Sequence, residues 1–241
     1  MNTTRDEASQ LARAIVGAVS ARTTSVDVVV LPPFPWLTDV AAILAGSNIN
    51  LGAQTINPEM GGAYTGEVSA RMLKGLCQYV LVGQYERRIL FSEKDAIVRR
   101  KLEAAHSNGL AAILCIGEDA DQLDEGLGPY VVAEQIEAAL GEAGPSTEMV
   151  IAYEPSWTTI GRVAPPPVSY VADVIGHIRQ TLADLYSAQV GEQTRVIYGG
   201  QVNPRNIADI ADVPTIDGVL AGTASTNATN FAGLVQAFAK R

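Results

Sequence analysis

The stretch RVIYGGQVNPRNIADIADVPTIDGVLAG, residues 195–222, decides the fold. It holds two short apolar runs, at 195–200 and 217–222, each ending in glycine, and a short helical pattern at 203–211 lies between them. Two apolar strands separated by a helix are typical of a parallel βαβ unit. The chain before and after this stretch continues the same alternation.

The alternation predicts seven strands and eight helices. The first helix opens with the capping box Thr4-x-x-Glu7 and carries Leu11, Ile15 and Val19 four residues apart. We expect strands at 27–33, 49–54, 79–83, 110–117, 149–155, 195–200 and 217–222. We expect helices at 3–20, 35–46, 69–76, 93–109, 130–141, 168–187, 203–211 and 227–241.

Regular alternation of strands and helices predicts the α/β class, with a parallel sheet and helices outside it. Eight units would close a (β/α)8 barrel, and seven leave it one strand short. An open, doubly wound sheet is the alternative, but it would usually carry a Gly-rich first turn, which this sequence lacks. No linker interrupts the pattern, so we expect a single domain over 1–241.

Composition narrows the class of protein further. Among the 241 residues, 47% are hydrophobic, which indicates a globular chain with a sizeable core. The net charge of −9 argues against a nucleic-acid binder, although backbone N–H groups can still hold a phosphate in an acidic protein. No apolar leader and no apolar run of about 18 residues is present, so we expect a cytoplasmic protein without membrane contact.

The cysteines and histidines do not suggest a metal site. Cys77 and Cys115 lie in apolar settings and are interpreted as reduced core thiols. Two cysteines without a C-x-x-C pair, together with two distant histidines, make a poor zinc set. We therefore expect neither a metal nor a cofactor.

Chemistry in such a barrel is expected at the carboxyl ends of the strands. Glu154 follows the run VIAY, where burial would raise its pKa and suit it to take a proton from carbon, although a structural carboxylate fits that position equally well. Glycines follow the strands at 195–200 and 217–222, where backbone N–H groups could form a phosphate site. Two ordinary tight turns would explain the glycines as well.

Six motifs together carry a family resemblance. They are GAYTGEVS (62–69), VLVGQYERR (80–88), CIGE (115–118), AYEPSW (152–157), YGGQVNP (198–204) and DGVLAGTAS (217–225). In this order and at this spacing, they resemble the triosephosphate isomerase family. The resemblance covers the whole chain and implies a TIM barrel and the interconversion of dihydroxyacetone phosphate and glyceraldehyde 3-phosphate through an enediolate, in glycolysis and gluconeogenesis.

The resemblance also implies roles for particular residues. Glu154 matches the catalytic base, Glu86 matches a carboxylate beside the substrate, and the loop 154–163 matches a lid. The loop 56–67 matches one that docks into a second subunit and places Thr65 near the neighbour's site, so a homodimer is implied. The positions that match substrate and phosphate contacts are Gly161, Gly200, Gln201, Gly222 and Thr223.

The sequence departs from the family at its start. The family places a lysine in an N-x-K motif at the end of its first strand, and neither that strand nor the lysine occurs in this sequence. Two interpretations remain open. Either the start codon was assigned at an internal methionine, or the protein is truncated or degenerate.

A second departure is Gln84, in GQYERR, where the family has G-H-S-E-R-R. The family's histidine is a neutral electrophile that can also relay a proton, whereas a Gln amide donates a hydrogen bond but does not titrate. His106 and His177 fall in predicted helices and cannot replace it. Tyr85 and Gln201 each replace a Ser of the family pattern. Thr223 replaces a Gly, and its β-carbon disfavours positive φ. The lid is about one residue shorter than in the family.

Two functions follow. The first is an aldose–ketose isomerase for a triose phosphate or a related tetrulose phosphate. Its activity is expected to be impaired, with Glu154 as base and Gln84 as a non-titrating donor to the carbonyl oxygen. The second is an inactive homologue that binds a phosphorylated metabolite or a partner protein. Isomerase turnover discriminates between them.

Overall fold

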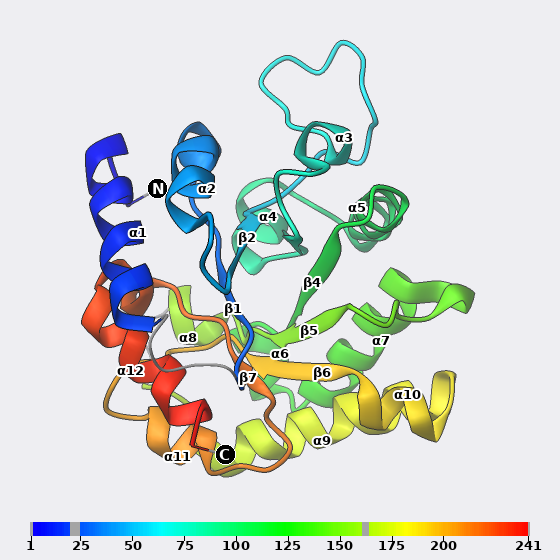
Figure 1. The fold of residues 1–241 in the computed structure, drawn as a ribbon. Coiled ribbons are helices and arrows are strands. Elements are labelled where there is room, and N and C mark those ends of the chain that lie inside the picture. The colour runs from blue at the N-terminus through cyan, green and yellow to red at the C-terminus, as the bar shows by residue number, and fades with distance from the viewer. Residues whose placement is uncertain (1, 20–24, 161–163, 241) are drawn as a thin grey trace.

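The computed structural model describes residues 2–19, 25–160 and 164–240 and contains one curled, wholly parallel sheet. Its strands follow chain order, so that each pairs with the next one along the sequence (Figure 1). Their bounds are β1 (Val28–Val30), β2 (Ile49–Ala53), β3 (Tyr79–Val82), β4 (Ala111–Ile116), β5 (Val150–Tyr153), β6 (Arg195–Tyr198) and β7 (Gly218–Val219). The seven predicted strands are therefore confirmed.

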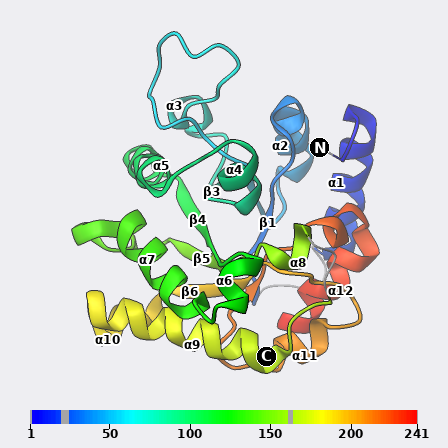
Figure 2. The same ribbon diagram turned by 180° about the vertical axis from the view of Figure 1, so that it is seen from behind.

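Helices surround this sheet, as the alternation predicts (Figure 2). The eight expected ones are α1 (Arg5–Val19), α2 (Leu37–Leu44), α3 (Ala70–Leu73), α5 (Asp95–Ser107), α7 (Gly128–Leu140), α9 (Val168–Leu185), α11 (Ile207–Ala211) and α12 (Ala228–Phe238). Further short helices are α4 (Tyr85–Leu90), α6 (Ala120–Asp124), α8 (Trp157–Ile160), α10 (Ala188–Gln193) and the 3-10 turns η1 (Phe34–Trp36), η2 (Gly141–Ala143) and η3 (Thr223–Thr226). Segments of three to six residues are too short to show a helical period, which explains why the sequence pattern misses them.

The capping box predicted for the first helix is present. The backbone N–H of Thr4 donates to Glu7 Oε2 at 2.7 Å, and the backbone N–H of Glu7 donates to Thr4 Oγ1 at 3.4 Å. The apolar face of α1 then packs against α2 and α12, so that the first and last helices of the chain lie side by side (Figure 1).

The sheet has a core on each face. The larger core lies between the sheet and the helices and contains the fully buried Tyr153 and Tyr198. The smaller core fills the inside of the curl and is built from Leu81, Ile113, Cys115, Val150 and Ala152. Both cysteines are buried and unpaired, as expected.

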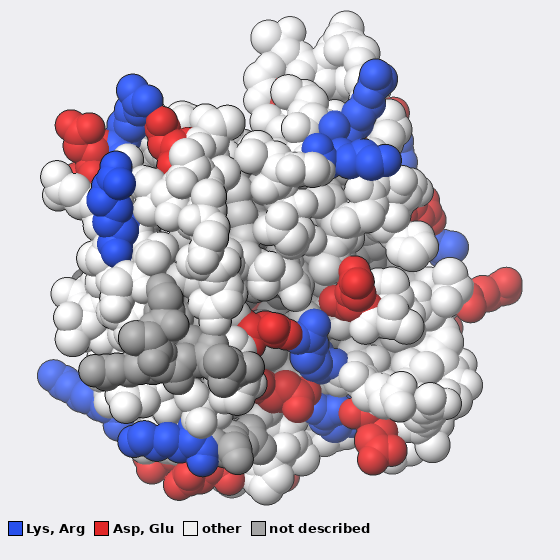
Figure 3. Space-filling model, viewed as in Figure 1, with Lys and Arg blue, Asp and Glu red and all other residues white. Residues whose placement is uncertain are grey.

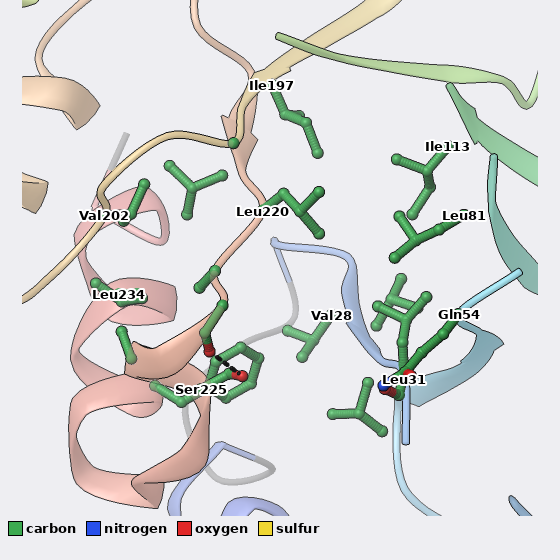
Figure 4. A pocket seen from close by; sticks show the side chains of 18 of the residues that line it. Val28, Leu31, Gln54, Leu81, Ile113, Ile197, Val202, Leu220, Ser225 and Leu234 are labelled. Carbon is green, nitrogen blue, oxygen red and sulfur yellow. Dashed lines mark hydrogen bonds between the residues drawn. The ribbon is translucent and has the colours of Figure 1, made fainter. Parts of the chain in front are cut away.

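The curl does not close between β1 and β7, which are the two edge strands among the described residues. We call the gap between them the seam. Outside the seam the helical layer is continuous, because α1 contacts α12. Figure 4 shows the apolar side chains that flank the seam, with Val28 and Leu31 on one side and Val202, Leu220 and Leu234 on the other.

Candidate active site

The carboxyl ends of the strands open into one large pocket of about 1600 Å³, which continues down the seam. Of the predicted site residues, those that line this pocket are Gln84, Glu86, Glu154, Gly200, Gln201, Gly222 and Thr223. Thr65 is not among them and lies on an exposed loop, and Gly161 lies outside the described residues. The fold therefore brings together residues that are up to 139 positions apart, from Gln84 to Thr223.

Glu154 follows β5 directly and is only partly exposed. Its Oε2 accepts a hydrogen bond from the backbone N–H of Tyr85 at 3.3 Å. Burial raises the pKa of its carboxyl to about 8, and the negative charge of Glu86 contributes to the rise. The Tyr85 N–H, the Arg88 guanidinium and the thiol of Cys115 act in the opposite direction. A carboxyl with such a raised pKa is suited to proton transfer near neutral pH.

Arg88 and Cys115 also act on the Glu154 carboxyl, although no sequence pattern predicted that they lie beside it. Arg88 follows β3 in the chain, where its Nε donates to the carbonyl of Gly83 at 2.7 Å and its Nη1 contacts Asp95 at 2.5 Å. Cys115 lies on β4, next to β5, and its thiol hydrogen-bonds to the Glu154 carboxylate. The signal that could have found both is their position at or after the carboxyl ends of β4, which pairs with β5, and of β3, which pairs with β4.

The side-chain amides of Gln54 and Gln84 form a short ladder across three strand ends, in which each amide donates to a backbone carbonyl at the end of the preceding strand. The Nε2 atom of Gln54 donates to the backbone carbonyl of Leu31 at 2.8 Å, and the Nε2 atom of Gln84 donates to the backbone carbonyl of Gln54 at 2.8 Å. Because a carbonyl can only accept, these bonds fix the orientation of both amides. The ladder ties β1 to β2 and β2 to β3 at the rim of the pocket.

A family comparison adds to this geometry. The triosephosphate isomerase family model matches residues 1–238. The chain belongs to the triosephosphate isomerase family. It is 41% identical over 239 residues to triosephosphate isomerase of Chloroflexus aurantiacus, covering 98% of this chain and 94% of that one. It is 41% identical over 241 residues to that of Moorella thermoacetica, with 98% and 94% covered, and 39% identical over 241 residues to that of Prosthecochloris aestuarii, with 100% and 95% covered.

Two glycines of the triosephosphate isomerase motifs have steric reasons to be glycine. A β-carbon on Gly117, in CIGE, would collide with the backbone carbonyl of Glu154. A β-carbon on Gly200, in YGGQ, would collide with the hydroxyl of Tyr198. Both glycines thus allow the close packing of backbone and side chains that sets the position of Glu154 and of the turn after β6.

Thr223, a departure from the triosephosphate isomerase pattern, is accommodated without strain. It opens η3, whose N-cap is Gly222, and the only non-glycine residue with positive φ in the described part of the chain is Ser92. The Ser225 hydroxyl donates to the Gly222 carbonyl at 2.6 Å, as the dashed line in Figure 4 shows. The 3-10 turn therefore accommodates the β-carbon of Thr223 without a positive φ.

The first residues of the predicted lid are held by Glu118, which is fully buried. Its Oε1 accepts from Tyr153 at 2.9 Å, from the indole N–H of Trp157 at 2.9 Å and from Tyr170 at 3.1 Å. Its backbone carbonyl accepts from the Ser156 N–H at 3.0 Å. Residues 155–158 of this triosephosphate isomerase family member are thus fixed on their β4 side, while 161–163 of the lid lie outside the described residues.

Two surface properties bear on possible partners. On the face shown in Figure 3, acidic and basic side chains alternate and form no extended basic region among the described residues. No helix in the described ranges is long and apolar enough to cross a membrane. His106 and His177 lie in α5 and α9, as expected, and do not line the pocket.

Proposed function

We propose that this chain is an aldose–ketose isomerase for a triose phosphate or a closely related tetrulose phosphate, with Glu154 as the base. The observation that carries the proposal is the Glu154 carboxyl, which lies in the pocket at the end of β5 with its pKa raised to about 8. The names of the relatives support the same reaction. A role in cytoplasmic glycolysis and gluconeogenesis would follow from it.

In the proposed reaction, the Glu154 carboxylate removes a proton from the carbon next to the substrate carbonyl. The electron pair of that C–H bond forms a double bond to the carbonyl carbon. The π electrons of the carbonyl move onto its oxygen, which carries the negative charge of the enediolate. Glu154 then returns the proton to the neighbouring carbon. A raised pKa helps both steps, because the carboxyl accepts and releases the proton at similar cost.

Gln84 is proposed to stabilise the charged oxygen. One N–H of its amide is held by the Gln54 carbonyl, and the same nitrogen carries a second N–H that can donate to the substrate. The amide cannot carry the hydroxyl proton from one oxygen to the other, so that transfer must use Glu154 or water. The reaction is therefore expected to be slower than with an imidazole at this position.

Backbone groups are proposed to hold the phosphate. The cationic side chains among the described lining residues are Arg87 and Arg195, and each is paired with a carboxylate, Glu93 at 2.8 Å and Asp27 at 2.7 Å. The remaining candidates are the turns after β6 and β7, which contain Gly200 and Gly222. Close approach of backbone N–H groups to a phosphate needs residues without side chains at such points.

The second candidate function is an inactive homologue that binds a phosphorylated metabolite or a partner protein. The non-titrating Gln84 favours it. Turnover of dihydroxyacetone phosphate and of a tetrulose phosphate distinguishes the two functions. The assay is run on the 241-residue chain and on the same chain preceded by a strand that ends in lysine, because such a strand would restore the family's pattern. Binding without turnover in both proteins would support the second function.

The pH dependence of the proposed reaction follows from the pKa of Glu154. The base acts as a carboxylate, so kcat/KM is expected to rise about tenfold per pH unit until the pH reaches the carboxyl's pKa of about 8, and then to level off. Glu86→Gln removes a negative charge that raises this pKa, so the rising limb should move to lower pH. Initial rates between pH 6 and 9.5 test this. An unmoved limb in Glu86→Gln would contradict it.

A homodimer is proposed through the loop 56–67 and the neighbouring helices, with Thr65 entering the partner's site. The loop projects from the body of the molecule between β2 and α3 (Figure 1). Large apolar side chains are exposed on it and on α3, α4 and the residue after α4: Met60, Tyr64, Met72, Ile89, Leu90 and Phe91. Exposed apolar surface of this kind typically marks a contact with another protein.

Tyr64→Asp is expected to weaken this dimer. Tyr64 is 47% exposed at the loop tip, and an interface aromatic typically contributes about 2 kcal/mol or more, or roughly 30-fold in Kd. Sedimentation velocity over a range of concentrations measures the shift to monomer. Tyr130→Asp is the matched control, because Tyr130 is 74% exposed and belongs to the helix α7 rather than to the loop. Equal effects of both changes would argue against this interface.

A further inference from the structure

Gln201 does not present its side chain in the manner expected of a phosphate contact. Its Nε2 atom donates a hydrogen bond to the backbone carbonyl of Thr158, which lies in α8, four residues after Glu154. Thr158 is fully buried, so its carbonyl depends on partners within the protein. The bond joins the turn after β6 to the segment after β5, across the rim of the pocket.

The turn that carries Gln201 is itself fixed. The Asn206 Nδ2 atom donates to the Gln201 carbonyl at 2.6 Å, and Asn206 Oδ1 accepts from the Asn203 N–H at 2.9 Å. Packing of Gly200 against the Tyr198 hydroxyl leaves no room for a β-carbon there. The backbone that carries Gln201 is therefore fixed by its own contacts. For that reason its side-chain hydrogen bond restrains α8, and α8 is not what holds Gln201 in place.

The segment 155–158 is thereby held from both sides. On the β4 side, Glu118 binds the Ser156 backbone and the Trp157 indole. On the β6 side, Gln201 binds Thr158. Glu154 immediately precedes this segment, and its Cβ lies 3.5 Å from the place that a β-carbon on Gly199 would occupy. A movement of 155–158 would therefore move the Glu154 carboxyl.

We infer that Gln201 is a positioning residue, which fixes α8 through Thr158 and so holds the Glu154 carboxyl in its place at the end of β5. The inference rests on the proposed role of Glu154 as the base. It reassigns the side chain of Gln201 from substrate contact to the support of the base. The groups that face the Glu154 carboxyl are Glu86 and Arg88 of α4, the Tyr85 N–H and Cys115 of β4.

Gln201→Met tests the inference, since it keeps the length of the side chain and removes its N–H donors. Losing one hydrogen bond is expected to raise the population of the open form of 155–158 about fivefold. A misplaced base should lower kcat by about 10- to 100-fold, with a smaller change in KM. As water reaches Glu154, its pKa should fall, which moves the rising limb of the pH profile to lower pH.

Movement of the segment is measured without substrate. The chain has two tryptophans, so Trp36→Phe leaves Trp157, which is 8% exposed, as the only fluorescent indole. In that background, Gln201→Met and Gln201→Ala should both increase acrylamide quenching of Trp157. Gln189→Ala, on the exposed surface of α10, is the matched control and should leave quenching unchanged.

The outcomes separate the inference from the proposed function. Unchanged quenching in both Gln201 variants overturns the inference, whether or not the protein turns over a sugar phosphate. Increased quenching with unchanged kcat and pH profile also overturns it, because Gln201 would then support the fold alone. Absence of turnover in the unmutated chain removes the proposed function, while quenching still shows whether Gln201 holds α8.

Discussion

Glu154→Gln is expected to lower isomerase turnover by about 10²–10⁴-fold or more, the range that a positioned general base contributes. Gln has the shape of a protonated Glu but cannot accept the proton from carbon. With a pKa of about 8, the Glu154 carboxyl is largely protonated in the resting protein at pH 7. The amide therefore resembles the resting side chain, and the fold should be retained. The measurement is kcat with a triose phosphate in a coupled assay.

Two further variants sharpen this result. Glu154→Asp keeps a carboxylate but draws it back by one methylene, so it should retain more activity than Gln and less than the unmutated chain. Glu148→Gln makes the same chemical change at an exposed carboxylate that precedes β5, and it should have no effect. If Glu154→Gln keeps the original rate, the proposed base is wrong and the second candidate function gains support.

Gln84→His is expected to raise kcat, by up to about 10²–10⁴-fold, the typical contribution of general acid–base catalysis. An imidazole can donate to the carbonyl oxygen and also relay a proton between the two oxygens, which the amide cannot do. A neutral imidazole carries a single N–H, so its donation to the substrate oxygen replaces the bond that Gln84 makes to the Gln54 backbone carbonyl. The measurement is kcat for both triose and tetrulose phosphates, since a gain for one alone would show which substrate fits the site.

Gln78→His is the control for this gain. Gln78 precedes β3, whereas Gln84 follows it, so the same exchange is made at the opposite end of the strand. It should leave turnover unchanged. A rate for Gln84→His no higher than that of the unmutated chain would mean that another group already moves the hydroxyl proton, or that this position does not reach the reacting oxygens.

The sequence predicted the sheet because its strands are short apolar runs, six of which end in glycine or proline and one, at 49–54, in Gln54. Helices with several turns, such as α5 and α9, were equally visible, since their apolar residues recur at helical spacing. The four-residue α8 gave no such signal, although it carries the contact with Gln201. Its position depends on bonds from two other strand ends, which no local pattern encodes.

The sequence predicted several residues that line the pocket, but it did not predict how their side chains are bonded. Position at strand ends identified Glu154, and the family motifs identified Gln84 and Gln201. The sequence could not show that the amides of Gln84 and Gln201 are engaged with backbone carbonyls, because those partners lie 30 and 43 residues away. Nor could it place Cys115 and Arg88 beside Glu154, because their proximity comes from strand order and helix packing.

The seam has a mechanical consequence for the site. In a closed barrel, every strand end is connected to its two neighbours, so the rim keeps a fixed circumference. Among the described residues, the strand ends that carry Gln54 and Gly222 are connected by strand pairing only through β3 to β6. The other links between the two sides lie away from this rim, in the packing of α1 on α12 and in the Asp27–Arg195 ion pair. The width of the pocket's opening therefore depends on how tightly the sheet curls. A small change in twist at each strand pair adds up across the sheet and changes the distance between the two sides of the seam.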